Sequence, residues 1–65
     1  MAEQVYKDRR ISIDVEISMD TAQAASPVWW RMIGEEEWKP TPFQTADSAH
    51  NAKAMLKKVD RWLES

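Results

Sequence analysis

The feature that most constrains the fold is an unbroken alternation of apolar and polar side chains over residues 10–19. Its apolar members are Ile11, Ile13, Val15, Ile17 and Met19, and its polar members are Arg10, Ser12, Asp14, Glu16 and Ser18. Successive side chains of a strand point to opposite faces of a sheet, so this period predicts a strand that is buried on one side and wet on the other. Such one-sided burial is typical of antiparallel sheets. Val5 has the same parity, which leaves an earlier start of the strand open.

Two further strands are predicted in the middle of the chain. Residues 28–33 are rich in side chains that favour strands. Gly34 and Glu35 then offer a tight turn, in which glycine tolerates a positive φ. Residues 36–39 would return as the third strand. Pro40 and Pro42 would end it, because each lacks the N–H that a strand ladder needs.

A single amphipathic helix is predicted at the C-terminal end. Thr45 is a good N-cap, and Asp47 would lie in the first turn, where the helix dipole favours a negative charge. The apolar side chains Ala49, Ala52, Met55, Leu56, Val59, Trp62 and Leu63 fall in an arc of about 140°. The fold class that follows is α+β: a three-stranded antiparallel sheet in β-β-β-α order, with the helix packed on one face.

Length and composition narrow the class of protein. A chain of 65 residues makes one domain (1–65), and a domain this small buries only about 60% of the surface of its unfolded chain. The absence of cysteine excludes disulfides and thiolate metal sites. The first residues do not have the pattern of a signal peptide, and no apolar run is long enough to span a membrane. We therefore expect a cytoplasmic protein that does not act at a membrane.

Catalytic chemistry has no candidate residues in this sequence. His50 is predicted on the wet face of the helix, where a solvated histidine is the simplest interpretation. No carboxylate lies in the apolar surroundings that would make it a general acid. Gly34 is the only glycine, so no phosphate-binding glycine loop exists. With one histidine and no cysteine, a metal site would need an uncommon carboxylate ligand set. We expect no enzyme activity, no catalytic residue, no metal and no cofactor.

The tryptophans carry the main functional hypothesis. Trp29 and Trp30 are adjacent, so on a strand they face opposite sides of the sheet. If Trp30 points at the helix, then Trp29, Arg31 and Ile33 face away from it. A two-residue turn would pair Arg31 with Trp38 and expose Trp38 on that same face, whereas a three-residue turn would pair Met32 with Trp38 and bury it.

These outward positions predict a non-enzymatic protein-binding module. Its binding residues would be Trp29, Arg31, Ile33, Trp38, Asp14 and Glu16. Tryptophan and arginine are enriched where binding energy is concentrated. Asp14 and Glu16, together with residues 35–37, would make the face acidic and suit a partner with a basic or mixed surface. A small inhibitor or regulator, of the size class that phages encode, fits this description.

Two alternatives stay open. Lys53, Lys57, Lys58 and Arg61 form the only basic stripe and could bind nucleic acid, with Lys7, Arg9 and Arg10 extending it. The net charge of −2 argues against nucleic acid, because such domains normally have a strong basic bias. The element order is similar to the later part of double-stranded RNA-binding domains, but residues 45–50 lack the basic cluster of those domains, so their function is not carried over. The other alternative is a homodimer that pairs edge strands or exposed tryptophan faces.

Overall fold

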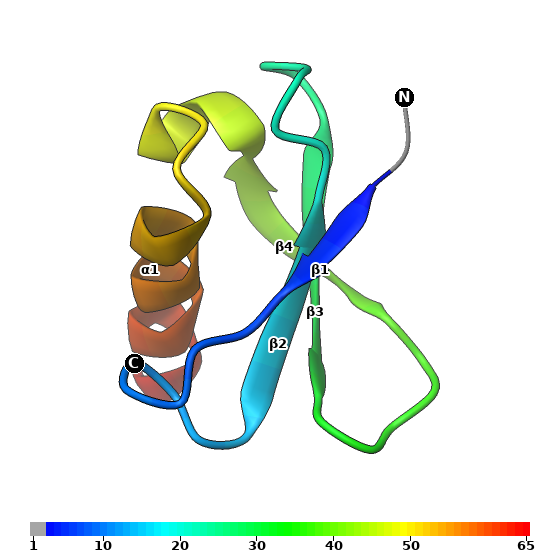
Figure 1. The fold of residues 1–65 in the computed structure, drawn as a ribbon, viewed down its shortest axis with the longest axis vertical. Helices are drawn as coiled ribbons and strands as arrows, with labels where there is room; N and C mark the ends of the chain where they lie inside the picture. The colour runs from blue at the N-terminus through cyan, green and yellow to red at the C-terminus, as the bar shows by residue number, and fades with distance from the viewer. Residues whose placement is uncertain (1–2) are drawn as a thin grey trace.

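The chain forms a four-stranded antiparallel sheet with one helix against one face, in a computed structural model that describes residues 3–65 (Figure 1). The strands β1 (Gln4–Tyr6), β2 (Val15–Met19), β3 (Pro27–Met32) and β4 (Lys39–Gln44) lie side by side in sequence order. A short 3-10 helix, η1 (Thr45–Ser48), leads to the C-terminal helix α1 (Ala52–Glu64). The α+β class is confirmed, and the predicted count of three strands is wrong. Within the described part of the chain, no helix has the length and apolar character needed to cross a membrane.

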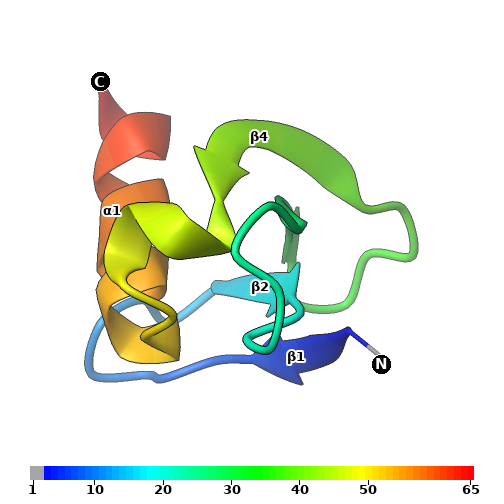
Figure 2. The same ribbon diagram turned by 90° about the horizontal axis from the view of Figure 1, so that it is seen from above.

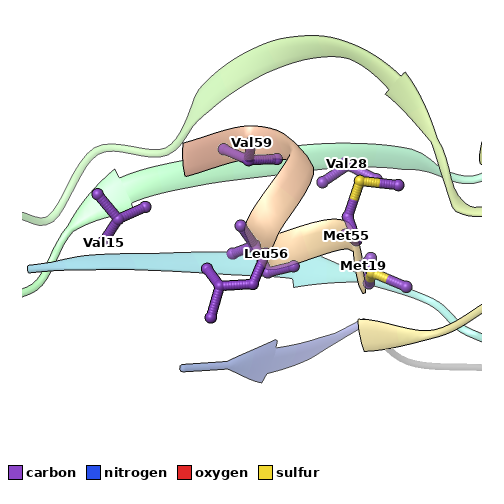
Figure 3. Close-up of a cluster of buried hydrophobic side chains, with 7 residues drawn as sticks. Val15, Met19, Val28, Met55, Leu56 and Val59 are labelled. Carbon is purple, nitrogen blue, oxygen red and sulfur yellow. The ribbon is translucent and has the colours of Figure 1, made fainter. Parts of the chain in front are cut away.

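The core lies between α1 and the sheet face turned toward it, called here the inner face (Figure 2). Opposed residues of antiparallel strands share a face, so the pairing of Tyr6 with Ile17 and of Ile17 with Trp30 places all three on the inner face. The buried core residues are Val15, Ile17, Met19 and Val28 from the sheet and Met55, Leu56 and Val59 from α1 (Figure 3). The periods of two and of 3.6 seen in the sequence therefore correspond to the two surfaces that meet in the core.

The predicted strand over residues 10–19 is wrong in its first half. Its regular part is β2 alone, and Ile13 is 75% exposed. The reason is a turn around Asp8, whose carbonyl accepts hydrogen bonds from the N–H groups of Ile11 and Ser12 (both 2.9 Å). The Asp8 carboxylate also accepts from the N–H of Arg10 (2.9 Å). These local bonds replace a strand ladder, so the alternation continues through a loop, where Ile11 packs against the core and Ile13 does not.

The predicted helix start at Thr45 is also wrong. Thr45 begins η1, is fully buried, and donates its hydroxyl toward the carbonyls of Asp20 (3.2 Å) and Ser26 (3.3 Å). Helix α1 is instead capped by Asn51, whose side chain accepts from the N–H of Ala54 (3.0 Å). Between the two helices, Ala49 has a left-handed φ of 54°, which ends the first one.

The return strand of the hairpin lies later than predicted. It is β4, and it contains Pro40 and Pro42 instead of ending before them. It can do so because it is an edge strand of the sheet, where proline is tolerated. The ladder is irregular between Pro27 and Trp29, and there the Thr41 hydroxyl donates to the carbonyl of Val28 (2.7 Å).

Candidate protein-binding face

The sheet face turned away from α1, called here the outer face, is not covered by any helix of residues 3–65 (Figure 2). Strand pairing places Val5, Ser18, Trp29 and Pro40 in one row across it. The pairing of Glu16 with Arg31 gives the next row, and the same register continued by one residue sets Trp38 opposite Arg31. Trp29, Arg31 and Trp38 are all partly exposed. The outer face therefore presents an aromatic and polar cluster built on three strands and the loop before β4.

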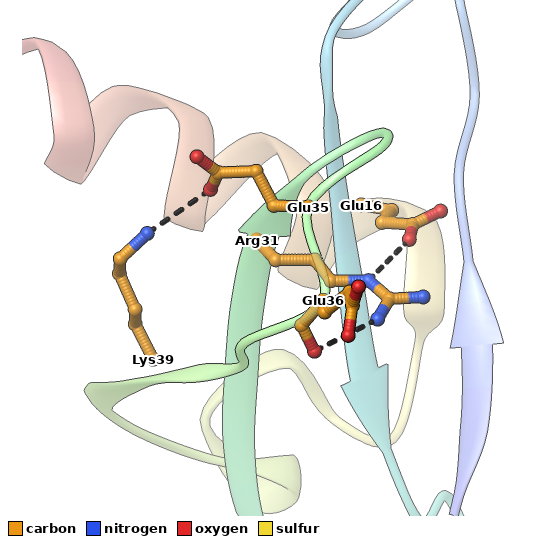
Figure 4. Close-up of polar contacts among 5 residues, drawn as sticks. All are labelled: Glu16, Arg31, Glu35, Glu36 and Lys39. Carbon is orange, nitrogen blue, oxygen red and sulfur yellow. Dashed lines mark hydrogen bonds and ion pairs between the residues drawn. The ribbon is translucent and has the colours of Figure 1, made fainter.

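Arg31 is the centre of this cluster (Figure 4). Its Nε donates to Glu16 Oε2 over 2.6 Å, and its Nη1 donates to the Glu36 carbonyl over 3.4 Å. Its Cζ lies 4.1 Å from the centroid of the Trp38 ring, within the range of a cation–π contact. One guanidinium thus connects β2, β3 and the loop that follows β3, and it holds Trp38 in place on the outer face.

The two outer tryptophans share a shallow, open depression. Trp29 and Trp38 line it together with Glu3. The Glu3 carboxylate accepts from the Ser18 hydroxyl (3.0 Å), which ties the residue before β1 to the outer face of β2. The depression therefore combines two indole rings with one carboxylate.

Four of the six residues predicted for protein binding meet in this cluster: Glu16, Trp29, Arg31 and Trp38. The structure has the register that sets Arg31 against Trp38, although the loop between β3 and β4 is longer than two residues. Glu16 lies on the expected face but is only 5% exposed, so it positions Arg31 and offers little surface to a partner.

Asp14 and Ile33, the other two predicted residues, lie together at the end of the sheet. The Ile33 N–H donates to the Asp14 carbonyl over 2.8 Å, and Ile33 is 41% exposed. Gly34 follows with a φ of 101°, in a turn that the Glu35 N–H closes onto the Met32 carbonyl (3.0 Å). A positive φ at the third position of such a turn favours glycine. These residues lie beside the cluster and do not line the depression.

Glu3 is the residue of this face that the sequence did not single out. Its position depends on β1, a strand of only three residues, which pairs with β2 and sets Val5 opposite Ser18. The one available signal was the parity of Val5 with the later alternation. That signal predicted a longer single strand, because nothing in the sequence marked the turn around Asp8.

The basic residues of the second hypothesis lie along the exposed side of α1. Lys53, Lys57, Lys58 and Arg61 are all exposed. The loop before β2 comes beside this stripe, since Arg10, Ile11, Lys57, Asp60 and Arg61 line one depression. Lys53 Nζ lies 4.0 Å from the Asp8 carboxylate, and Asp60 interrupts the stripe. The surface therefore has interleaved charges of both signs.

No group of three or more metal-binding side chains was found among residues 3–65. His50 lies in the turn before α1 with a φ of 64°, and its Nδ1 is 2.7 Å from the Thr21 carbonyl. The hydrogen bond from the Arg10 N–H lowers the pKa of Asp8 below its ordinary value, and the charges of Arg10 and Lys53 act in the same direction.

No protein-family model, curated protein or solved structure matches the chain. We therefore infer the function from the geometry of the outer face and from the charges around it.

Proposed function

We propose that the chain is a non-enzymatic protein-binding module that acts through its outer face. The observation that carries this proposal is the depression on the face opposite α1, which is lined by Trp29 and Trp38. Buried tryptophans contribute strongly to the energy of protein interfaces, and the core of this domain does not need these two rings. Their place beside Arg31 gives the face the residue types that are most enriched at binding hot spots.

The cluster is organised before any partner binds. Arg31 is fixed by Glu16 and by the Glu36 carbonyl, and its guanidinium in turn restricts Trp38. A side chain that is already held in one position loses less conformational entropy on binding. This supports a recognition role for the face over a role as a passive cover of the sheet.

The charges around the depression favour a partner with a basic or mixed surface. Arg31 is neutralised by Glu16, whereas Glu3 adds exposed negative charge at the depression and Glu36 and Glu37 add it in the loop before β4. Complementary charge speeds the encounter and disfavours acidic competitors.

A module of this size acts chiefly by covering part of its partner. A standard interface takes about 800 Å² from each protein, and the whole chain exposes 4339 Å². Binding would therefore use about a fifth of its surface, which suits a small inhibitor or regulator. We propose a cytoplasmic location, because a chain without cysteine needs no oxidising compartment.

Affinity capture with mass spectrometry tests this function. The wild-type chain, the variant Trp29→Ala and the control Lys57→Ala, which changes the opposite side of the molecule, are immobilised and exposed to the same lysate. We expect one protein to be enriched by the wild type and the control, and its purified form to bind Trp29→Ala about thirtyfold more weakly, as for a hot-spot residue of about 2 kcal/mol. Undiminished binding to a Trp29→Ala chain that still unfolds cooperatively would refute the proposal.

Nucleic-acid binding is the second candidate function. The observation that favours it is the depression that brings Arg10 beside Lys57 and Arg61, since neither segment alone makes a basic surface. This function predicts affinity for DNA or RNA that falls steeply with salt and is weakened in Lys57→Ala. Absence of binding to either polymer at low salt would eliminate it.

A further inference from the structure

The structure holds a cation between a carboxylate and an indole ring at two places. Lys39 lies 3.1 Å from Glu35 and 4.9 Å from the centroid of the Trp30 ring, and Arg31 is the example on the outer face. Arg31 lies 2.6 Å from the Glu16 carboxylate and 4.1 Å from the centroid of the Trp38 ring. The carboxylate supplies the opposite charge, and the electron-rich ring face supplies a second, weaker attraction. All three groups lie on the outer face.

Another carboxylate and indole lie on the same face as the Arg31 set, with no cation from residues 3–65 held between them. Glu3 and Trp29 line the same depression as Trp38. Among residues 3–65, the ion pairs involve other carboxylates, and the cation–π contacts involve Trp38, Trp30 and Phe43. The Ser18 hydroxyl bonds Oε1 of Glu3, which fixes the carboxylate and leaves Oε2 for another donor.

We propose that the depression between Trp29, Trp38 and Glu3 binds an arginine side chain of the partner protein. The guanidinium would stack on the Trp29 ring and donate to the Glu3 carboxylate, in the way that Arg31 is held by Trp38 and Glu16. This inference rests on the proposed function and names the group that the binding face recognises.

Arginine fits this site better than lysine. Its planar guanidinium stacks on an aromatic ring and donates to a carboxylate at the same time, whereas the compact ammonium of lysine is more strongly hydrated. The site is open, and a weakly hydrated cation costs less to place there. The nearest positive charge does not oppose the ligand, since the Arg31 guanidinium is paired with Glu16.

Nuclear magnetic resonance titration with three blocked tripeptides tests the inference directly. The peptides are acetyl-Gly-X-Gly-amide with X as arginine, lysine or citrulline, the last being a neutral isostere of arginine. The indole N–H signals of Trp29 and Trp38 report on the depression, and those of Trp30 and Trp62, which pack toward the core, are internal controls. Trp29→Phe and Trp38→Phe assign the signals.

We expect the arginine peptide to shift the Trp29 and Trp38 signals in a saturable way, the lysine peptide to bind more weakly, and citrulline to have no effect. Glu3→Gln should weaken arginine binding about threefold, as expected for the loss of an exposed ion pair. The matched control Glu37→Gln, an exposed acid outside the depression, should leave it unchanged. Equal shifts with citrulline, equal shifts of all four indoles, or unchanged affinity in Glu3→Gln would overturn the inference.

The two proposals fail separately. If a partner is captured through Trp29 but the arginine peptide does not bind, the outer face is a binding face without an arginine subsite. If the peptide binds as expected but no partner depends on Trp29, the subsite exists and the proposed function is wrong.

Discussion

Replacing Arg31 with methionine removes the guanidinium and keeps an unbranched apolar stem over the sheet. The lost contacts are the 2.6 Å bond to Glu16 and the stacking on Trp38. A hydrogen bond to a charged group contributes about 1.5–3 kcal/mol, and an exposed cation–π contact contributes about 0.5–1 kcal/mol. Because the Arg31 side chain is 25% exposed, water can reach Glu16 after the change and offset part of the loss. We expect Arg31→Met to lower the free energy of unfolding by about 2 kcal/mol.

That loss is large for a domain of this size. The free energy of unfolding of 65 residues is about 3–10 kcal/mol. A loss of about 2 kcal/mol corresponds to a fall of about 8–16 °C in the melting temperature. Thermal and urea unfolding, followed by circular dichroism and tryptophan fluorescence, measure it.

A double-mutant cycle with Glu16→Gln isolates the pair. Glu16→Gln alone should cost about 1 kcal/mol, since it keeps the shape and loses the charge. In the Arg31→Met background the same change should cost nothing or stabilise the fold, because it removes a buried charge without a partner. Lys39→Met is the control: it breaks a pair with Glu35 in which both side chains are about half exposed, and it should cost less than about 1 kcal/mol.

Additivity would refute this reasoning. If the effects of Glu16→Gln and Arg31→Met add to within about 0.5 kcal/mol, the two residues do not act as a unit. The cluster would then not be organised before binding, and Trp38 would have no fixed position for a partner to recognise.

The remaining predictions concern the corrected parts of the fold. Thr45→Val should lower the free energy of unfolding in urea by about 1–2 kcal/mol through the lost hydroxyl bonds, while Thr45→Ser keeps them; equal losses would contradict this. Ile13→Ser should lower the free energy of unfolding by less than about 0.5 kcal/mol, and Ile17→Ala by about 2–5 kcal/mol. Similar losses would indicate that Ile13 is buried, as the predicted strand over residues 10–19 requires. Asp8 has a folded-state pKa below its ordinary value of 3.8, so its stabilisation is complete above that value and is lost as the pH falls through the folded pKa. Asp8→Asn should therefore be less stable than the wild type at neutral pH and equally stable in strong acid. A difference in the free energy of unfolding that persists in acid would show that the charge of Asp8 is not the cause.

Side-chain periodicity predicted the elements whose burial is set by long-range packing. Ile17 and Met19 lie on the inner face, and Met55, Leu56 and Val59 meet them from α1, as the periods of two and 3.6 indicated. In these segments the burial of apolar side chains determines the conformation, so the apolar positions of the sequence pattern are the residues buried in the core.

Local hydrogen bonds explain where the same pattern misled. The alternation continues through Ile11 and Ile13, but the turn around Asp8 forms the backbone hydrogen bonds there in place of a strand ladder. Thr45 and Asn51 both belong to the residue types that cap helices, and local sequence does not decide between them. Burial of the Thr45 hydroxyl against two carbonyls decided it, and those carbonyls belong to a loop some twenty residues earlier in the chain.

The candidate binding face was predictable only in part. The outward direction of Trp29 and Arg31 follows from strand parity alone. The place of Trp38 depends on a register that short-range sequence leaves open, and the contribution of Glu3 depends on β1, which is too short to show a period. The position of Trp38 and the contribution of Glu3 are both determined by the pairing between strands.

The presence of Pro40 and Pro42 in β4 has a consequence for self-association. Two of the six residues of that strand cannot donate a backbone hydrogen bond, so an incoming strand finds an incomplete ladder on that side. If two copies pair their edge strands into one continuous sheet, the pairing must therefore involve β1, next to Glu3. A dimer made in this way would crowd the proposed arginine site, and self-association and partner recognition would then compete for the same end of the molecule.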